Sequence, residues 1–265
     1  MEYLILGAEG YIGSYLFLRM KTDKLNVVGT GHGNVRYNDL TYYDILIKPN
    51  IEIAGLAAKS KKTAIICIGQ TNIDLCKMEH ELSRKINVTA AKELIRVLAN
   101  DGYYIIYFST DNVFDGKKGN YNESDGTCAI NEYGKMKEEM EHFLLNEYPD
   151  ACIFRLPKVL GTNRLEKNMV TDMENKLKGG EVRCIKGTKM SVVSLEDVYQ
   201  ACLIASMRRM GGIYHLSTGE FYSRKEIAEI IRDCLGFRHS RIVELDIESF
   251  GFKDRRPLDV GLDSN

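Results

Sequence analysis

The sequence predicts an α/β fold, a doubly wound parallel sheet followed by a smaller C-terminal lobe. Two observations lead to this fold class. Apolar runs alternate with segments of helical periodicity up to about residue 156, and the runs are nearly continuous, as in parallel strands covered on both faces. After Pro157 the alternation gives way to shorter and more charged elements, which predicts a second unit.

The individual elements follow from these runs. Apolar, β-branched and aromatic stretches predict strands at Tyr3–Leu6, Asn26–Thr30, Thr63–Ile68, Tyr103–Phe108 and Cys152–Leu156. Helical periodicity predicts helices at Tyr11–Lys21, Met78–Asn100, Asn131–Glu147 and Leu195–Arg208. The crossovers between parallel strands are expected to be right-handed.

The elements beyond Pro157 predict the smaller lobe. They are a helix at 165–177, an isolated strand at 181–185, a strand at 212–216 and a helix at 223–235. Ser223 and Glu226 form a capping-box pattern that opens the last helix. No flexible linker separates the parts, so we expect a first domain at 1–156 and a smaller lobe at 157–265 that is interleaved with it.

The first strand runs into a turn with three glycines spaced three apart, Gly7, Gly10 and Gly13. In dinucleotide-binding folds such glycines provide a tight turn, a close approach of the backbone to a pyrophosphate, and close helix–strand packing. The following helix offers free N–H groups to the phosphates. This turn at the start of a strand–helix unit predicts a Rossmann-type dinucleotide site, and a P-loop is excluded because no Gly-Lys-Ser/Thr follows.

Four candidate site segments follow strands and therefore meet at one edge of the sheet. They are the glycine turn, the residues 68–71, the pair Ser109 and Thr110, and the pair Leu156 and Pro157. Ligands of open α/β sheets bind outside the carboxyl ends of the strands. We therefore expect one site built from all four segments.

A tyrosine and a lysine four residues apart, Tyr133 and Lys137, predict acid–base chemistry at that edge. On a helix this spacing places both side chains on one face. An ammonium beside a phenol favours the phenolate, which would lower the tyrosine pKa and make it a usable general acid. A hydroxyl at the end of the strand, from Ser109 or Thr110, would orient a carbonyl, and strand alternation sends these two to opposite faces.

The composition excludes several classes of protein. The net charge of −1 with mixed charges implies neither a nucleic-acid nor an anionic-membrane partner. No apolar run approaches the roughly 20 residues of a membrane span, and no signal peptide is evident. Seven scattered cysteines without a C-x-x-C pair predict reduced thiols in a cytoplasmic protein, and no cluster has metal-ligand spacing.

The chain resembles an extended short-chain dehydrogenase/reductase, and within that group the dTDP-4-dehydrorhamnose reductase family. The residues that carry the resemblance are the glycine turn, Ile86–Ala91, Ser109–Gly116, Tyr133–Lys137, Gly212–Leu216 and the late Arg256-Pro257-x-Asp259. The resemblance implies reduction of the keto group of a nucleotide-linked deoxysugar with NADP or NAD as cofactor. A homodimer is a candidate assembly.

The resemblance also implies roles for individual residues. Tyr133 would be the proton donor, Lys137 its pKa tuner and a nicotinamide-ribose ligand, and Thr110 the carbonyl-orienting hydroxyl. The implied cofactor contacts are Gly7, Gly10, Tyr11, Ile12, Gly13, His32, Arg36, Asp39, Leu40, Ile68, Gly69, Tyr133 and Lys137. The implied substrate contacts are Asn112, Phe114 and Arg256.

Two alternatives remain open at this point. A non-catalytic nucleotide-binding regulatory subunit would keep the fold and the cofactor, and relatives of this shape include a regulatory subunit of methionine adenosyltransferase. A sugar-nucleotide epimerase or dehydratase would also be an enzyme acting on nucleotide sugars, but with a different reaction. Dehydratases of this kind use an Asp-Glu pair after the strand-end threonine, whereas this chain has Asp111 and Asn112, which disfavours elimination.

The second strand bears on the choice of cofactor. It ends Gly29-Thr30-Gly31-His32-Gly33, with no carboxylate at its tip to take a ribose 2′-hydroxyl. With His32 and Arg36 close behind, we expect NADPH to be preferred or at least accepted, since basic residues accommodate a 2′-phosphate.

Overall fold

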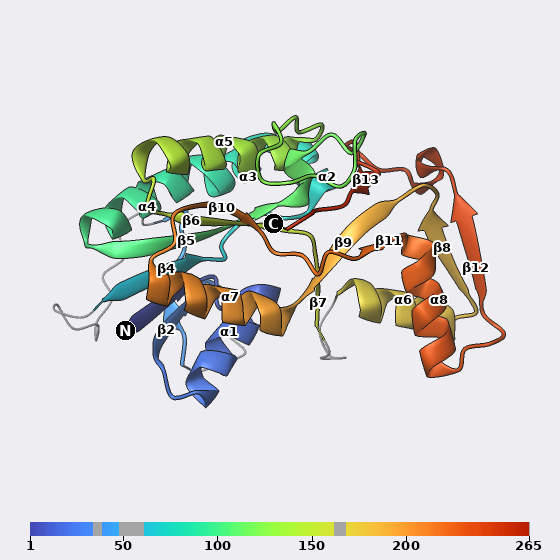
Figure 1. The fold of residues 1–265 in the computed structure, drawn as a ribbon, viewed down its shortest axis with the longest axis horizontal. Helices are drawn as coiled ribbons and strands as arrows, with labels where there is room; N and C mark the ends of the chain where they lie inside the picture. The colour runs from blue at the N-terminus through green and yellow to red at the C-terminus, as the bar shows by residue number, and fades with distance from the viewer. Residues whose placement is uncertain (34–38, 48–60, 162–167, 265) are drawn as a thin grey trace.

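The computed structural model describes residues 1–33, 39–47, 61–161 and 168–264. Within these residues, seven strands form a parallel sheet in the order β10-β6-β5-β4-β1-β2-β3. The strands are β1 Glu2–Leu6, β2 Asn26–Gly31, β3 Thr41–Tyr42, β4 Lys62–Ile66, β5 Tyr103–Thr110, β6 Cys152–Leu156 and β10 Gly212–His215. The predicted parallel sheet is therefore confirmed, and Figure 1 shows helices on both of its faces.

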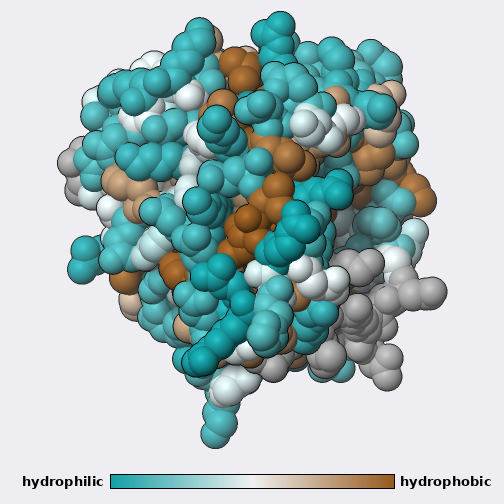
Figure 2. Space-filling model, turned by 90° about the vertical axis from the view of Figure 1, so that its right-hand side faces the viewer, coloured by the Kyte–Doolittle hydropathy of each residue, from teal (hydrophilic) through white to brown (hydrophobic). Residues whose placement is uncertain are grey.

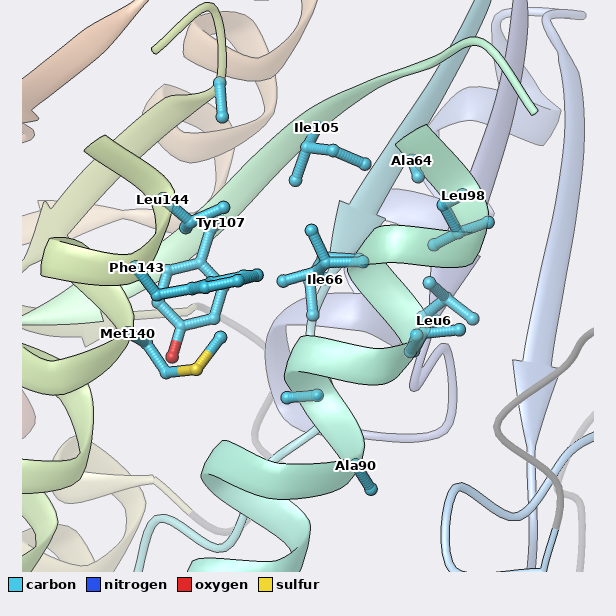
Figure 3. Close-up of a cluster of buried hydrophobic side chains, with 14 of the residues drawn as sticks. Leu6, Ala64, Ile66, Ala90, Leu98, Ile105, Tyr107, Met140, Phe143 and Leu144 are labelled. Carbon is cyan, nitrogen blue, oxygen red and sulfur yellow. The ribbon is translucent and has the colours of Figure 1, made fainter. Parts of the chain in front are cut away.

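One face of the sheet is covered by the helices α4 (Ala91–Asn100) and α5 (Glu132–Glu147). Figure 3 shows how Leu98 from α4 and Met140 and Phe143 from α5 pack with Leu6, Ile66 and Tyr107 of the sheet. The opposite face is covered by α1 (Tyr11–Thr22) and α7 (Leu195–Arg208), whose side chains pack on the alternate strand residues. Burial on both faces explains why the strands read as continuous apolar runs.

The expected helix over residues 78–100 is confirmed from His80 to Asn100, as α3 (His80–Arg84), a π-helical turn at Lys85–Ala90 and α4 in direct succession. A separate short helix, α2 (Ile73–Met78), precedes it. Glu79 breaks the helical conformation with φ −113° and ψ 49°, and the Asn72 side chain caps the start of α2. Helical periodicity in the sequence does not reveal such a break.

The smaller lobe combines α6 (Met169–Lys178) and α8 (Arg224–Leu235) with two small sheets. In one sheet β9 (Lys189–Ser194) pairs with β7 (Lys158–Leu160), β11 (Phe221–Tyr222) and β13 (Asp259–Val260). In the other, β8 (Glu181–Ile185) pairs in parallel with β12 (Arg241–Leu245), so the strand expected to be isolated has a partner. Ser223 caps α8 through the predicted capping box with Glu226.

The strand expected at 212–216 in the smaller lobe belongs to the large sheet instead, where β10 pairs with β6. The helix before it, α7, also covers the large sheet, so the C-terminal half returns to the first unit before completing the second. This arrangement interleaves the two lobes along the chain. No helix of the described residues has both the length and the apolar character needed to cross a membrane.

Candidate active site

A cavity of about 750 Å³ lies at the carboxyl edge of the large sheet and is closed on its other side by the smaller lobe. The glycine turn, the loop after β4, and the ends of β5 and β6 all line it, as expected from the topology. Of the predicted site residues it brings together Gly10, Tyr11, Ile12, Gly13, Ile68, Gly69, Thr110, Asn112, Tyr133, Lys137 and Arg256. Figure 2 shows a hydrophobic band across the surface of the side that carries the smaller lobe.

The glycine turn has the shape that a dinucleotide requires. Gly7 adopts φ +86°, in the left-handed region that favours glycine. A Cβ on Gly13 would lie 2.2 Å from the carbonyl oxygen of Gly7, so glycine is needed for α1 to pack this closely. A Cβ on Gly10 would meet only that same oxygen, at 3.4 Å, and Gly10 lines the cavity. The turn and the first N–H groups of α1 therefore fit a pyrophosphate.

Tyr133 is held at the start of α5 by a local hydrogen-bond network. The Asn131 side chain caps the helix by accepting from the Gly134 N–H at 2.8 Å, and it donates to Asn112 Oδ1 at 3.1 Å. A Cβ on Gly134 would lie 2.1 Å from the Asn112 carbonyl oxygen, so glycine lets α5 sit directly against the loop after β5. These contacts place the Tyr133 ring at the cavity wall beside Thr110.

Lys137 lies one turn further along α5 and is also buried. Its Nζ donates to the Phe108 carbonyl oxygen at 2.7 Å and to the Tyr107 hydroxyl at 3.1 Å. The ammonium lies 6.0 Å from the centre of the Tyr133 ring. The predicted shared face of the helix is confirmed, but the partners of the ammonium are Tyr107 and the backbone.

The protonation states differ from the expectation that Lys137 lowers the Tyr133 pKa. Burial raises the pKa of Tyr133, and the nearby Asp111 carboxylate raises it further, while a hydrogen bond with Thr110 acts in the opposite direction. Burial lowers the pKa of Lys137 to about 8. Desolvation outweighs the attraction between the two groups, so Tyr133 stays a phenol throughout the physiological range.

The two strand-end hydroxyls lie in different environments. The Ser109 hydroxyl donates to Glu141, which forms a buried ion pair with Arg155 at 2.7 Å. The Thr110 hydroxyl lies near Tyr133 and donates to Asp111 Oδ1 at 3.0 Å. Thr110 is therefore the strand-end hydroxyl that lies beside the phenol.

Asn87 holds the loop that follows β4. Its Oδ1 accepts from the Gln70 N–H at 2.7 Å and its Nδ2 donates to the Gln70 carbonyl oxygen at 2.9 Å. A Cβ on Gly69 would lie 3.1 Å from that Oδ1. Asn87 therefore fixes this loop beside the cavity through the backbone of Gln70.

Among the expected cofactor contacts, His32, Asp39 and Leu40 do not line the cavity. The His32 side chain is exposed and Asp39 is exposed, while Leu40 packs beneath the sheet. Arg36 lies outside the described residues. A carboxylate does stand at the tip of the second strand, contrary to expectation, because Glu9 reaches it from the glycine turn.

Two of the three expected substrate contacts line the cavity, and the third does not. Asn112 and Arg256 line the cavity, and Arg256 is paired with Asp74 at 2.8 Å and stacked 4.5 Å from the Phe252 ring centre. Phe114 is fully buried and stacks on Tyr121 at 4.1 Å, outside the cavity. The assignment of Phe114 to the substrate is therefore corrected, since its ring fills a small core of its own.

Two cations that the sequence did not indicate also line the cavity, Lys158 from β7 and Arg224 from the start of α8. No carboxylate of the described residues lies within ion-pair distance of either group. Burial lowers the pKa of both, and each is lowered further by Arg256. Cations that repel one another around an open cavity favour an anionic ligand.

Comparisons with known proteins agree with the fold. A hypothetical dTDP-4-dehydrorhamnose reductase from Sulfolobus tokodaii is 30% identical, with a TM-score of 0.86, over 100% of this chain and 92% of that one. A dTDP-4-dehydrorhamnose reductase from Clostridium acetobutylicum is 26% identical, with a TM-score of 0.83, over 99% and 90% of the two chains.

The sequence is also similar to a protein with a different name. Methionine adenosyltransferase 2 subunit beta from Xenopus laevis is 27% identical over 95% of this chain and 77% of that protein. The family model described as the RmlD substrate binding domain matches residues 1–265. The chain therefore belongs to the RmlD substrate binding domain family.

Proposed function

We propose that this chain is an NAD(P)H-dependent reductase of a nucleotide-linked keto-deoxysugar. The observation that carries the proposal is the meeting of Thr110, Tyr133 and Lys137 with the glycine turn in one cavity. The names of the two reductases similar in sequence and structure support it. The bound dinucleotide would supply the hydride.

The residues of the chain would orient the carbonyl and supply the proton. Thr110 would turn its hydroxyl proton from Asp111 to the sugar carbonyl, and Tyr133, kept neutral by burial, would deliver its proton to the developing alkoxide. Lys137, anchored by the Phe108 carbonyl oxygen, would donate to the nicotinamide ribose. A positioned acid of this kind contributes about 10²–10⁴-fold to the rate.

The opposite wall supports a nucleotide diphosphate as the anionic part of the substrate. Arg256 can take a phosphate in a bidentate fork once it exchanges part of its contact with Asp74. Lys158 and Arg224 add two further positive charges to the same cavity. The wall therefore favours a substrate with two or more negative charges over a neutral sugar.

A second candidate function is a nucleotide-binding subunit of a larger enzyme, favoured by the similarity to a methionine adenosyltransferase subunit. The decisive experiment supplies NADH or NADPH with a dTDP-linked 4-keto-6-deoxyhexose and follows the loss of reduced nicotinamide. Turnover that disappears in Tyr133→Phe would support the reductase. Binding of the dinucleotide without turnover of dTDP-, UDP- or GDP-linked keto sugars would favour the subunit.

A further inference from the structure

The tip of β2 carries a carboxylate from a different part of the chain. Glu9 Oε1 accepts from the backbone N–H of His32 at 3.2 Å, and Glu9 Oε2 accepts from that of Gly33 at 3.1 Å. A Cβ on Gly31 would lie 2.8 Å from Glu9 Oε2, so glycine at the end of the strand makes room for this side chain. Glu9 thus lies between the glycine turn and the end of the second strand.

This position is the one that discriminates between the two dinucleotides. In folds of this class the adenosine ribose lies at the end of the second strand, where a carboxylate binds the 2′-hydroxyl of NAD and basic groups accept the 2′-phosphate of NADP. Two successive backbone N–H groups form a concave site that suits an anion. Here the Glu9 carboxylate already occupies the N–H groups of His32 and Gly33, so a 2′-phosphate loses these donors.

Charge at the tip of β2 also disfavours a 2′-phosphate. The His32 ring is 3.4 Å from Glu9 Oε1, so the one nearby described base already faces the carboxylate. A dianionic phosphate placed beside Glu9 would meet a like charge at the protein surface. Like charges a few ångströms apart at a surface change binding by about tenfold or more.

We propose that Glu9 makes this chain select NADH over NADPH, by offering its carboxylate to the ribose hydroxyls and excluding the 2′-phosphate. The inference rests on the proposed dinucleotide site but not on the identity of the sugar. It reverses the preference that the strand sequence predicted, because the deciding carboxylate comes from the turn 23 residues earlier in the chain.

Calorimetric titration of the full chain with NADH and NADPH tests the inference. Adenosine 5′-monophosphate and adenosine 2′,5′-bisphosphate serve as probes that isolate the 2′-phosphate. We expect NADH and the monophosphate to bind at least about tenfold more tightly than their 2′-phosphorylated counterparts. In Glu9→Gln and Glu9→Ala this ratio should fall to about threefold or less, mainly through tighter binding of the 2′-phosphorylated ligands.

Asp101→Asn is the matched control, because it removes an exposed carboxylate from the turn before β5 without touching the N–H groups of residues 32 and 33. It should leave the ratio unchanged. Equal binding of NADH and NADPH by the unaltered chain, or the same ratio in the Glu9 variants, overturns the role of Glu9 while leaving the reductase intact. Absence of binding by all four probes overturns the dinucleotide site itself.

Discussion

The two walls of the cavity differ in whether their charged side chains have partners within the protein. On the wall formed by the large sheet, Lys137 has two hydrogen-bond acceptors, and the buried ion pair of Glu141 with Arg155 lies outside the residues that line the cavity. On the wall formed by the smaller lobe, Lys158 and Arg224 have no carboxylate of the described residues within ion-pair distance. The first wall is organised before a ligand arrives, whereas the second depends on a ligand to neutralise it. This difference supports the proposal that the first wall carries the chemistry and the second binds the anionic part of the substrate.

The largest expected effect is on the organised wall. Tyr133→Phe should lower kcat by about 10²–10⁴-fold, because the proton donor is lost while the ring and its packing remain. The dissociation constant of NADH should change by less than about threefold, since a lost neutral hydrogen bond has a small net effect. Steady-state kinetics and NADH titration measure the two quantities.

Tyr107→Phe is the matched control for this prediction. It removes another buried hydroxyl that contacts Lys137, at 3.1 Å, without removing the proton donor. Its kcat should remain within about tenfold of the parent, because Lys137 keeps the Phe108 carbonyl oxygen as partner. Equal losses in the two variants would show that Tyr133 acts only through Lys137.

The next effect concerns the wall that carries Lys158 and Arg224, for which the described part of the chain offers no carboxylate within ion-pair distance. Arg224→Ala and Lys158→Ala should each raise the KM for the sugar nucleotide by about tenfold or more, since hydrogen bonds to charged groups contribute about 1.5–3 kcal/mol. The kcat should change little. Lys225→Ala is the control, because that neighbouring lysine is paired with Glu244 at 3.2 Å and does not line the cavity. An unchanged KM in both cavity variants would show that this wall does not bind the anionic part of the substrate.

The pH dependence of the reaction tests the role of Lys137 on the wall formed by the large sheet. Burial sets the pKa of Lys137 at about 8, so the ammonium is present below that pH and is lost as the pH rises through it. The value of kcat/KM for NADH should therefore fall above pH 8, by about tenfold per unit, if one ionisation controls it. Lys137→Met should have a low kcat/KM for NADH at every pH and should not show this decline. A decline that persists in this variant would mean that a group other than Lys137 titrates.

The smallest expected effect is on the stability of the smaller lobe. Ser223→Ala removes the capping box at the start of α8 and should lower the free energy of unfolding by about 1 kcal/mol. Because Ser223 precedes Arg224, the KM for the sugar nucleotide should rise less than in Arg224→Ala. Thermal unfolding and kinetics of the same variant test both statements. A KM increase as large as that of Arg224→Ala would mean that the cap, and not the guanidinium, forms the site.

The sequence predicted the sheet and the organised wall well because both have local signals. Continuous apolar runs marked the strands, and the glycine turn and the Tyr133–Lys137 spacing marked their ends. The cation wall had no such signal, since Lys158 and Arg224 are single charges that only tertiary structure brings to one cavity. The same reason explains the missed role of Glu9, whose partners belong to another strand end.

Two errors have a different origin. The resemblance implies Phe114 as a substrate contact, but the chain turns after the strand end and buries the ring against Tyr121. The strand expected at 212–216 is predicted in the smaller lobe because it follows Pro157, but as β10 it pairs with β6 of the large sheet. Distance along the sequence does not determine on which side of a cavity a segment lies.

The cavity joins segments from nearly opposite ends of the sequence. Phe252, Arg256 and β13 complete a wall that faces the glycine turn of residues 7–13, and Tyr121 bridges to Leu262. Contacts of such long sequence separation form late, because the intervening chain must be ordered first. During synthesis the large sheet can gather most of its strands before these residues emerge. In refolding, the helical signal should therefore return before the ability to bind a nucleotide sugar.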